Sequence, residues 1–91
     1  MGTLEGKRVV ITGSGQGLGR AYAMAMAREG AKLVINDIEA DVAEQTVADI
    51  AAEGGSAVIN TDDVADFAAA RRIIESCVET YGGLDTLVNN A

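Results

Sequence analysis

The sequence has no histidine, no proline and no tryptophan, and it has a single cysteine. Without histidine, these residues cannot form a Ser-His-Asp triad or a histidine-ligated zinc site. Cys77 cannot form an internal disulfide, and its place on the apolar face of a predicted helix favours a buried thiol over a nucleophile. The remaining composition, 48% hydrophobic and 23% charged, is that of one small globular domain.

Positive charge is also scarce. Seven Lys and Arg stand against 14 Asp and Glu, for a net charge of −7, and only Arg71 and Arg72 are adjacent. Nucleic acids and anionic membranes require clustered basic side chains, so neither is an expected partner. The sequence shows no secretory signal and no apolar run long enough to span a membrane. We therefore expect a cytoplasmic protein.

Short apolar runs alternate with amphipathic helical patterns along the whole chain. The expected strands are 7–12, 32–37, 56–60 and 84–88, and the expected helices are 18–29, 40–53 and 66–81. Glycines follow each helical pattern, where they commonly end helices. The order βαβαβαβ with short connections predicts an α/β fold of the Rossmann type, a partial doubly wound parallel sheet with helices on both faces. The expected strand order is 3-2-1-4.

Helical spacing also predicts which side chains each helix buries. The expected buried set is Leu18, Tyr22, Ala25 and Met26 in the first helix, Ala43, Val47, Ile50 and Ala51 in the second, and Phe67, Ala70, Ile74, Cys77, Val78 and Tyr81 in the third. Arg20 and Asp49 are expected to face solvent. Asp66 is the expected N-cap of the third helix.

A glycine-rich turn joins the first strand to the first helix. Its glycines let the backbone approach a pyrophosphate, and the helix N-terminus offers free N–H groups and partial positive charge. The chain has no P-loop sequence, and the G-x-G-x-x-G form would need glycine where Leu18 or Arg20 stands. The turn residues expected to contact a nucleotide are Gly13, Ser14, Gly15, Gln16, Gly17, Leu18 and Gly19.

Three segments of the chain resemble motifs of one protein family. The run 12–19, T-G-x-x-x-G-x-G, is similar to the cofactor motif of the short-chain dehydrogenase/reductase family. Asp63-Val64 resembles the family's adenine-contacting Asp-Val, and residues 89–91 resemble the start of its N-N-A-G motif. The resemblance covers all 91 residues and favours the single-domain branch, since Gln16 does not fit the extended branch's glycine pattern. It implies hydride transfer between a nicotinamide dinucleotide and an alcohol or carbonyl substrate.

Asp37 bears on which dinucleotide is bound. It closes the second strand, where a carboxylate can accept hydrogen bonds from the ribose hydroxyls and would repel a 2′-phosphate. NADP-preferring members of the family place a basic residue just before the middle glycine or just after the second strand, and these positions hold Gln16 and Ile38. The predicted cofactor is NAD.

At the ends of the third and fourth strands, alternatives stay open. Asp62 or Asp63 could serve only to cap the following helix, and we favour Asp63 for the cofactor because it precedes Val64. Asn89 is expected to be structural, satisfying backbone groups between strands. Asn90 and Ala91 are expected to contact the cofactor.

The resemblance implies a catalytic Tyr with a Lys four residues later, together with a Ser and an Asn. Met26 follows Tyr22 at that spacing and Asp85 follows Tyr81, so we assign no catalytic residue and no metal ligand. The chain is interpreted as the N-terminal, cofactor-binding part of a longer enzyme with a small-molecule substrate, inactive by itself. Its fourth strand would be an open edge that favours homo-oligomers or pairing with the missing part.

Two other functions remain as alternatives. One is a non-catalytic nucleotide-binding or assembly fragment. The other is an S-adenosylmethionine-dependent methyltransferase, because residues 13–17 also satisfy G-x-G-x-G and Asp37 would suit that ribose. Methyltransferases usually carry an acidic residue two positions before the first glycine, where this chain has Ile11.

Overall fold

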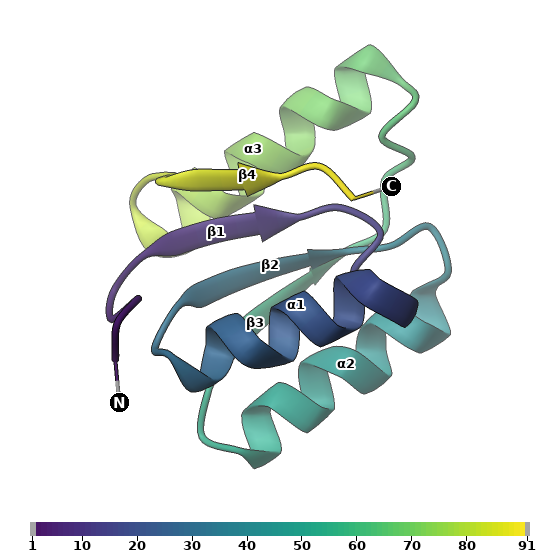
Figure 1. Cartoon of the computed structure of the whole chain (residues 1–91). Coiled ribbons are helices and arrows are strands. Elements are labelled where there is room, and N and C mark those ends of the chain that lie inside the picture. Colours follow the sequence, from purple (N-terminus) through teal and green to yellow (C-terminus); the bar gives the residue numbers. More distant parts are fainter. Residues whose placement is uncertain (1, 91) are drawn as a thin grey trace.

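The computed structural model describes residues 2–90 of the chain. The elements in chain order are β1 (Arg8–Ile11), α1 (Gly17–Arg28), β2 (Lys32–Asn36), α2 (Ala40–Ala52), β3 (Ser56–Asn60), α3 (Phe67–Tyr81) and β4 (Thr86–Val88). The strands form one parallel sheet in the order β3-β2-β1-β4, with α1 and α2 on one face and α3 on the other (Figure 1). The prediction of a partial Rossmann-type fold with strand order 3-2-1-4 is confirmed.

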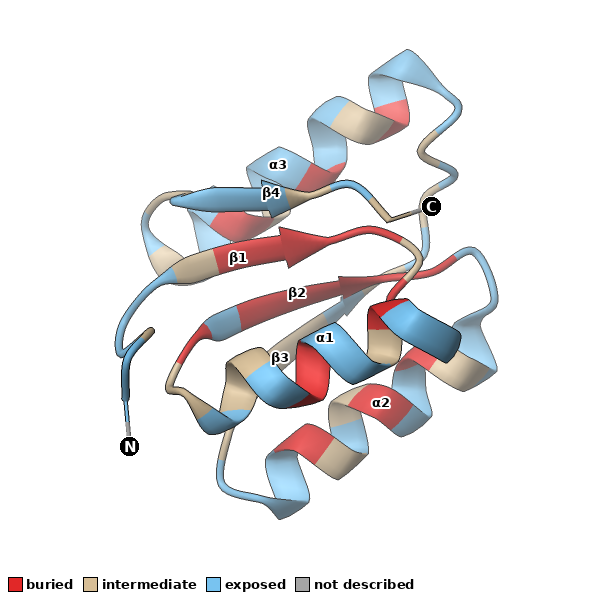
Figure 2. Cartoon of the chain, viewed as in Figure 1, coloured by how far each residue is buried: buried red, intermediate tan, exposed pale blue. Residues whose placement is uncertain are grey.

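Successive residues of the central strands face opposite sides of the sheet and so build two separate cores. Val9 and Ile11 face α1 and α2, whereas Val10 joins Ile73 and Cys77 under α3. Both inner strands are buried along most of their length (Figure 2). Each fully buried Val, Ile or Leu contributes about 1.5–3 kcal/mol. The Cys77 thiol is buried as predicted, and this burial raises its pKa.

The ends of α3 follow the predicted chemistry. The Asp66 side chain accepts a hydrogen bond from the N–H of Ala68 at 2.9 Å, which satisfies one of the free donors of the first turn. At the other end Gly82 takes the left-handed conformation with φ of 82° and donates to the Val78 carbonyl. β4 is shorter than expected and begins at Thr86; just before it, the Asp85 side chain accepts from the N–H of Arg8 at 2.8 Å.

The predicted buried face of α1 is wrong at three of its four positions; only Met26, which is half-buried, packs against the core. Leu18 is 61% exposed, and Tyr22 and Ala25 are exposed too, while Gly19, Ala23 and Met24 are buried. Almost every turn of this helix is apolar, so hydrophobic spacing does not distinguish its faces. Gly19 faces inward where α1 lies close to the Gly13 carbonyl, just after β1.

The predicted face of α3 is only partly correct: Cys77 is buried, and Ala70 and Tyr81 are half-buried. Phe67 is 90% exposed, and Ile74 and Val78 are exposed, whereas Ala69, Ile73 and Cys77 form the buried stripe. The sequence offers two neighbouring apolar stripes. Packing against the sheet covers one of them, and of the predicted set only Cys77 is fully buried.

Helix α2 agrees better, with Ala43 and Ile50 buried as predicted. Ala51 is exposed, and its expected place in the core is taken by Thr46, which is completely buried. A hydroxyl at such a position needs a hydrogen-bond partner, and it has one in the glycine turn described below.

Candidate functional site

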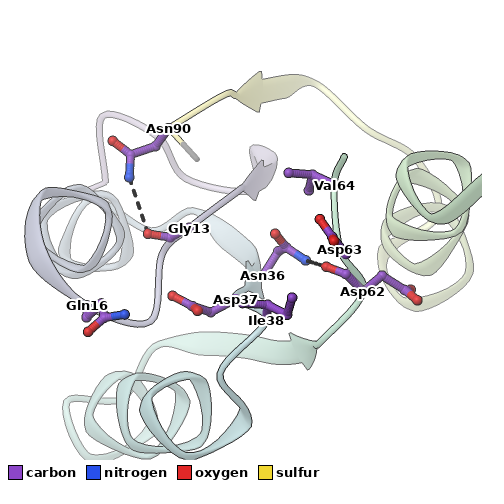
Figure 3. Close-up of a pocket in the computed structure, with 9 residues that line it drawn as sticks. All are labelled: Gly13, Gln16, Asn36, Asp37, Ile38, Asp62, Asp63, Val64 and Asn90. Atoms are coloured by element: carbon purple, nitrogen blue, oxygen red, sulfur yellow. Dashed lines mark hydrogen bonds between the residues drawn. The ribbon is translucent and has the colours of Figure 1, made fainter. Parts of the chain in front are cut away.

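The carboxyl ends of all four strands meet at one edge of the sheet. In open parallel sheets this edge, where the strand order reverses beside β1, is the usual ligand site. A pocket of about 260 Å³ lies there, near the lower end of the range for small-molecule sites (Figure 3). It is lined by Gly13, Gln16, Asn36, Asp37, Ile38, Asp62, Asp63, Val64 and Asn90.

The glycine turn leads from β1 into α1 with two residues in the left-handed region, Gly13 with φ of 60° and Gly17 with φ of 59°. Gly19 has no room for a side chain, since a Cβ there would lie 2.6 Å from the amide nitrogen of Asn90 and closer still to the Gly13 carbonyl oxygen. Among residues 2–90, no side chain caps the start of α1 and its first turn holds no acidic residue. The turn therefore presents N–H groups that suit an anion.

Ser14 lies in this turn, but its side chain does not line the pocket. The hydroxyl is completely buried, donates to the Ile11 carbonyl at 2.6 Å and accepts from the Asn36 N–H at 3.1 Å. It thereby ties the turn to the ends of β1 and β2. Gly15, Gly17, Leu18 and Gly19 also lie outside the lining of the pocket, on the turn and first helical residues beside it.

Asp37 follows β2 and is 5% exposed, yet its carboxylate borders the pocket. Oδ2 accepts from the N–H of Gly15 at 3.1 Å, and Oδ1 accepts from the N–H of Glu39 at 3.0 Å. Figure 3 shows this carboxylate directed toward the glycine turn. A carboxylate held by two backbone donors keeps a fixed orientation and can still accept further hydrogen bonds from a ligand.

Three lining residues, Asn36, Ile38 and Asp62, are not among the predicted cofactor contacts. The buried Asn36 amide donates to Asn60 Oδ1 at 2.9 Å and to the Asp62 carbonyl at 3.0 Å, which fixes the loop after β3. Asp62 pairs with Arg72 at 3.1 Å, and this contact lowers the pKa of the Asp62 carboxyl. A polar residue closing an otherwise apolar strand is the sequence feature that could have identified Asn36.

Of the two adjacent acids, neither is the cap of α3. That role belongs to Asp66, while Asp63 accepts from the Ala65 N–H at 2.9 Å within the loop. Asp63 and Val64 both line the pocket.

The end of β4 is fastened to the glycine turn. The N–H of Asn90 donates to Thr12 Oγ1 at 2.9 Å, and its side-chain amide donates to the Gly13 carbonyl at 3.2 Å (Figure 3). Asn89 Oδ1 lies 3.3 Å from Thr12 Oγ1, a contact between strand ends that agrees with the structural role expected of Asn89. Ala91 lies outside the described residues.

The chemistry of this edge suits a dinucleotide. It combines an uncapped helix N-terminus for phosphate, a buried carboxylate for ribose hydroxyls, and apolar Val64 and Ile38 against which an adenine ring can lie. Within residues 2–90 there is no group of three His, Cys, Asp or Glu side chains placed to hold a metal ion. No helix in that range has both the length and the apolarity to cross a membrane.

The profile of the short chain dehydrogenase family matches residues 7–91. The chain belongs to the short-chain dehydrogenase family. Membership excludes the methyltransferase alternative and agrees with the three motifs of the glycine turn, the loop after β3 and the end of β4. Solved structures of dehydrogenases share the fold of this chain.

Among its relatives, the chain is 47% identical to the 2,5-dichloro-2,5-cyclohexadiene-1,4-diol dehydrogenase LinX of Sphingobium indicum, over 97% of this chain and 35% of LinX. A short chain dehydrogenase from Burkholderia cenocepacia in complex with NADP superposes with a TM-score of 0.91 and 42% identity, over 97% of this chain and 36% of that one. A 7α-hydroxysteroid dehydrogenase complexed with NADH and 7-oxo glycochenodeoxycholic acid has a TM-score of 0.95 and 36% identity, over 97% and 34%. The chain thus spans about a third of the length of each of these relatives.

Proposed function

We propose that this chain is the NAD-binding part of an oxidoreductase that transfers a hydride between NAD(H) and an alcohol or carbonyl substrate. One observation carries the proposal: the Asp37 carboxylate is buried, oriented by two backbone N–H groups and open to the pocket beside the glycine turn. That arrangement suits the paired hydroxyls of an adenosine ribose.

The residues around Asp37 favour NAD over NADP. A 2′-phosphate at this ribose would meet the carboxylate at close range, and no basic side chain lines the pocket. Arg72 is paired with the lining residue Asp62. Solved relatives contain NADP in one case and NADH in another, so the preference argued here rests on this chain's own residues.

Bound NAD would supply the hydride acceptor, and the residues of this chain would hold its adenosine and pyrophosphate parts. The first turn of α1 would receive the pyrophosphate, Asp37 the ribose, and Asp63 with Val64 the adenine. The proton transfer that accompanies hydride transfer needs a positioned acid or base with a suitable pKa. Tyr81 does not provide one, because burial raises its pKa and its hydroxyl donates to the Leu33 carbonyl at 3.1 Å.

The direct test is a pair of titrations of the protein that contains this chain, with NADH and with NADPH, by calorimetry and nicotinamide fluorescence. We expect tighter binding of NADH. Equal or tighter binding of NADPH would contradict the proposed preference, and no binding of either dinucleotide would contradict the cofactor site itself.

A further inference from the structure

We infer that Thr46 and Arg20 are positioning residues that orient the Asp37 carboxylate through the Gly15 segment of the glycine turn. The inference rests on the proposed role of Asp37 toward the ribose. Neither residue lines the pocket, and neither belongs to the motifs that identify the family. Arg20 belongs to α1 and Thr46 to α2, the two helices that cover the same face of the sheet (Figure 1).

The first link joins α2 to the turn. Thr46 is completely buried, and its hydroxyl donates to the carbonyl of Gly15 at 2.8 Å. Arg20 Nη1 donates to the same hydroxyl oxygen at 2.9 Å. A hydroxyl has one proton and two acceptor sites, so the guanidinium occupies an acceptor site and leaves the proton for the carbonyl. The direction of the relay from Arg20 through Thr46 to Gly15 is thus determined.

The second link joins the turn to the carboxylate. Gly15 accepts from Thr46 with its carbonyl and donates to Asp37 Oδ2 with its N–H, so the residue is held on both sides. It fits very closely, since a Cβ at Gly15 would lie 2.9 Å from both Asp37 Oδ2 and the Ala43 backbone nitrogen. A small movement of this residue would therefore change the hydrogen bond that orients Asp37.

The third link fixes the guanidinium. The second arm of Arg20 pairs with Asp49 on α2, and this contact, together with an amide of Gln45 at 2.8 Å from Asp49 Oδ1, lowers the pKa of the Asp49 carboxyl. Arg20 was expected to face solvent, but it is half-buried between the helices.

A second arginine of α1 serves as a control for the contacts that Arg20 makes with α2. Arg28 also reaches from α1 to α2, where it pairs with Glu53 in two contacts of 2.8 and 3.1 Å. That pair joins the C-terminal end of α1 to the residue that follows α2, whereas the glycine turn precedes the N-terminus of α1. A comparison of the two arginines therefore separates bracing of the helices from positioning of the turn.

Removal of the Thr46 hydroxyl would leave the Gly15 carbonyl buried without its donor. An unsatisfied buried acceptor costs about 1–3 kcal/mol, so the turn would relax toward other partners. The Gly15 N–H would then hold Asp37 less well, and the ribose hydroxyls would lose a fixed acceptor. The effect should fall on recognition of the ribose rather than on general dinucleotide binding.

The test compares Thr46→Val, Thr46→Ser, Arg20→Met and Arg28→Met in the protein that contains this chain. The first readout is the amide proton shift of Gly15 by NMR without ligand, which reports the bond to the carboxylate. The second is the affinity ratio of NAD to 2′-deoxy-NAD, which reports ribose recognition. We expect Thr46→Val to move the Gly15 amide upfield and lower the ratio about tenfold, given the size of a lost buried hydrogen bond.

The remaining variants sharpen the outcome. Thr46→Ser keeps the hydroxyl, so both readouts should match those of the unmutated protein. Arg20→Met should lower the affinity ratio of NAD to 2′-deoxy-NAD by a smaller factor than Thr46→Val does. Arg28→Met should leave this ratio unchanged. The inference is overturned if Thr46→Val changes neither readout, or if Arg28→Met has the same effect as Arg20→Met. If Thr46→Val does not fold, the two arginine variants decide the question. If the unmutated protein does not distinguish NAD from its 2′-deoxy form, the proposed function fails. The amide proton shift of Gly15 then tests by itself whether Thr46 and Arg20 position the turn.

Discussion

The N–H of Gly15 donates to Asp37 Oδ2 at 3.1 Å, a hydrogen bond that joins the glycine turn to the end of β2. The two residues belong to what the sequence presents as separate features, one for the pyrophosphate and one for the ribose. In the structure they are one unit, since the turn orients the carboxylate and the carboxylate fixes the turn. A substitution that moves the glycine turn should therefore also change the orientation of the Asp37 carboxylate, and the reverse should hold.

Replacing Asp37 with Ala should lower the affinity for NAD by about tenfold or more, because the ribose hydroxyls lose a charged acceptor. Affinity for NADP should change less, since repulsion of the 2′-phosphate is removed at the same time. Calorimetric titrations with both dinucleotides check this. Asp41→Ala is the matched control, because it removes the same charge from an exposed position in the first turn of α2. An equal effect of both variants would show that only net charge matters.

An Ile38→Arg variant should bind NADP more tightly than the unmutated protein. Ile38 lines the pocket directly after Asp37 and is exposed, so a guanidinium there can reach a 2′-phosphate without loss of core packing. The gain should be up to about fivefold, the size of an exposed ion pair, and should shrink at high salt. Ile38→Gln serves as the uncharged control. Unchanged NADP affinity at low salt would place the ribose elsewhere.

Gly19→Ala should destabilise the fold and weaken dinucleotide binding together. The added methyl would collide with the Gly13 carbonyl and the Asn90 amide, neither of which can move without shifting the turn or the end of β4. Overpacking of this kind costs about 1–3 kcal/mol. Urea denaturation followed by circular dichroism measures the loss. An Ala21→Gly variant on the exposed side of the same helix offers a reference for backbone propensity, at about 1 kcal/mol.

The Arg8–Asp85 pair should contribute an acid-dependent part of the stability. Hydrogen bonds from the Arg8 side chain and N–H lower the pKa of Asp85 from 3.8 to about 2. Since the folded-state pKa lies below the unfolded one, the contribution is complete above pH 4 and is lost as the pH falls toward 2. Urea midpoints measured across this range should converge for the unmutated protein and Asp85→Asn at the acid end. A constant difference between them would contradict the assignment.

Two substitutions on α3 distinguish its two apolar stripes. Ile73→Ala should cost about 2–5 kcal/mol, since the side chain is buried in the smaller core with Val10 and Cys77. Phe67→Ala should change stability by no more than about 0.5 kcal/mol, because the ring is 90% exposed. Chemical denaturation of both variants provides the comparison. The reverse ranking would mean that the helix buries the face expected from its spacing.

Much of the architecture follows from local sequence. Short apolar runs of three to five residues define the strands, and the capping residues Asp66 and Gly82 define the ends of α3. The glycine turn, Asp37 and Val64 could be assigned to one edge because parallel strands bring their carboxyl ends together. These features depend on the residues themselves and their immediate neighbours, so they can be read without knowledge of the packing.

The orientation of the helices depended on the tertiary structure. In α1 and α3 two adjacent faces are apolar enough to be buried, and only packing against the sheet decides which of them is covered, as at Ala23 and Ala69. The same packing brings Arg20 and Thr46 together behind Gly15, although they are 26 residues apart and neither belongs to a recognisable motif. The order of the elements and the position of the glycine turn follow from the residues alone. Only the packing of α1 and α2 against the sheet decided what holds that turn in place, because such contacts depend on distance in space rather than along the chain.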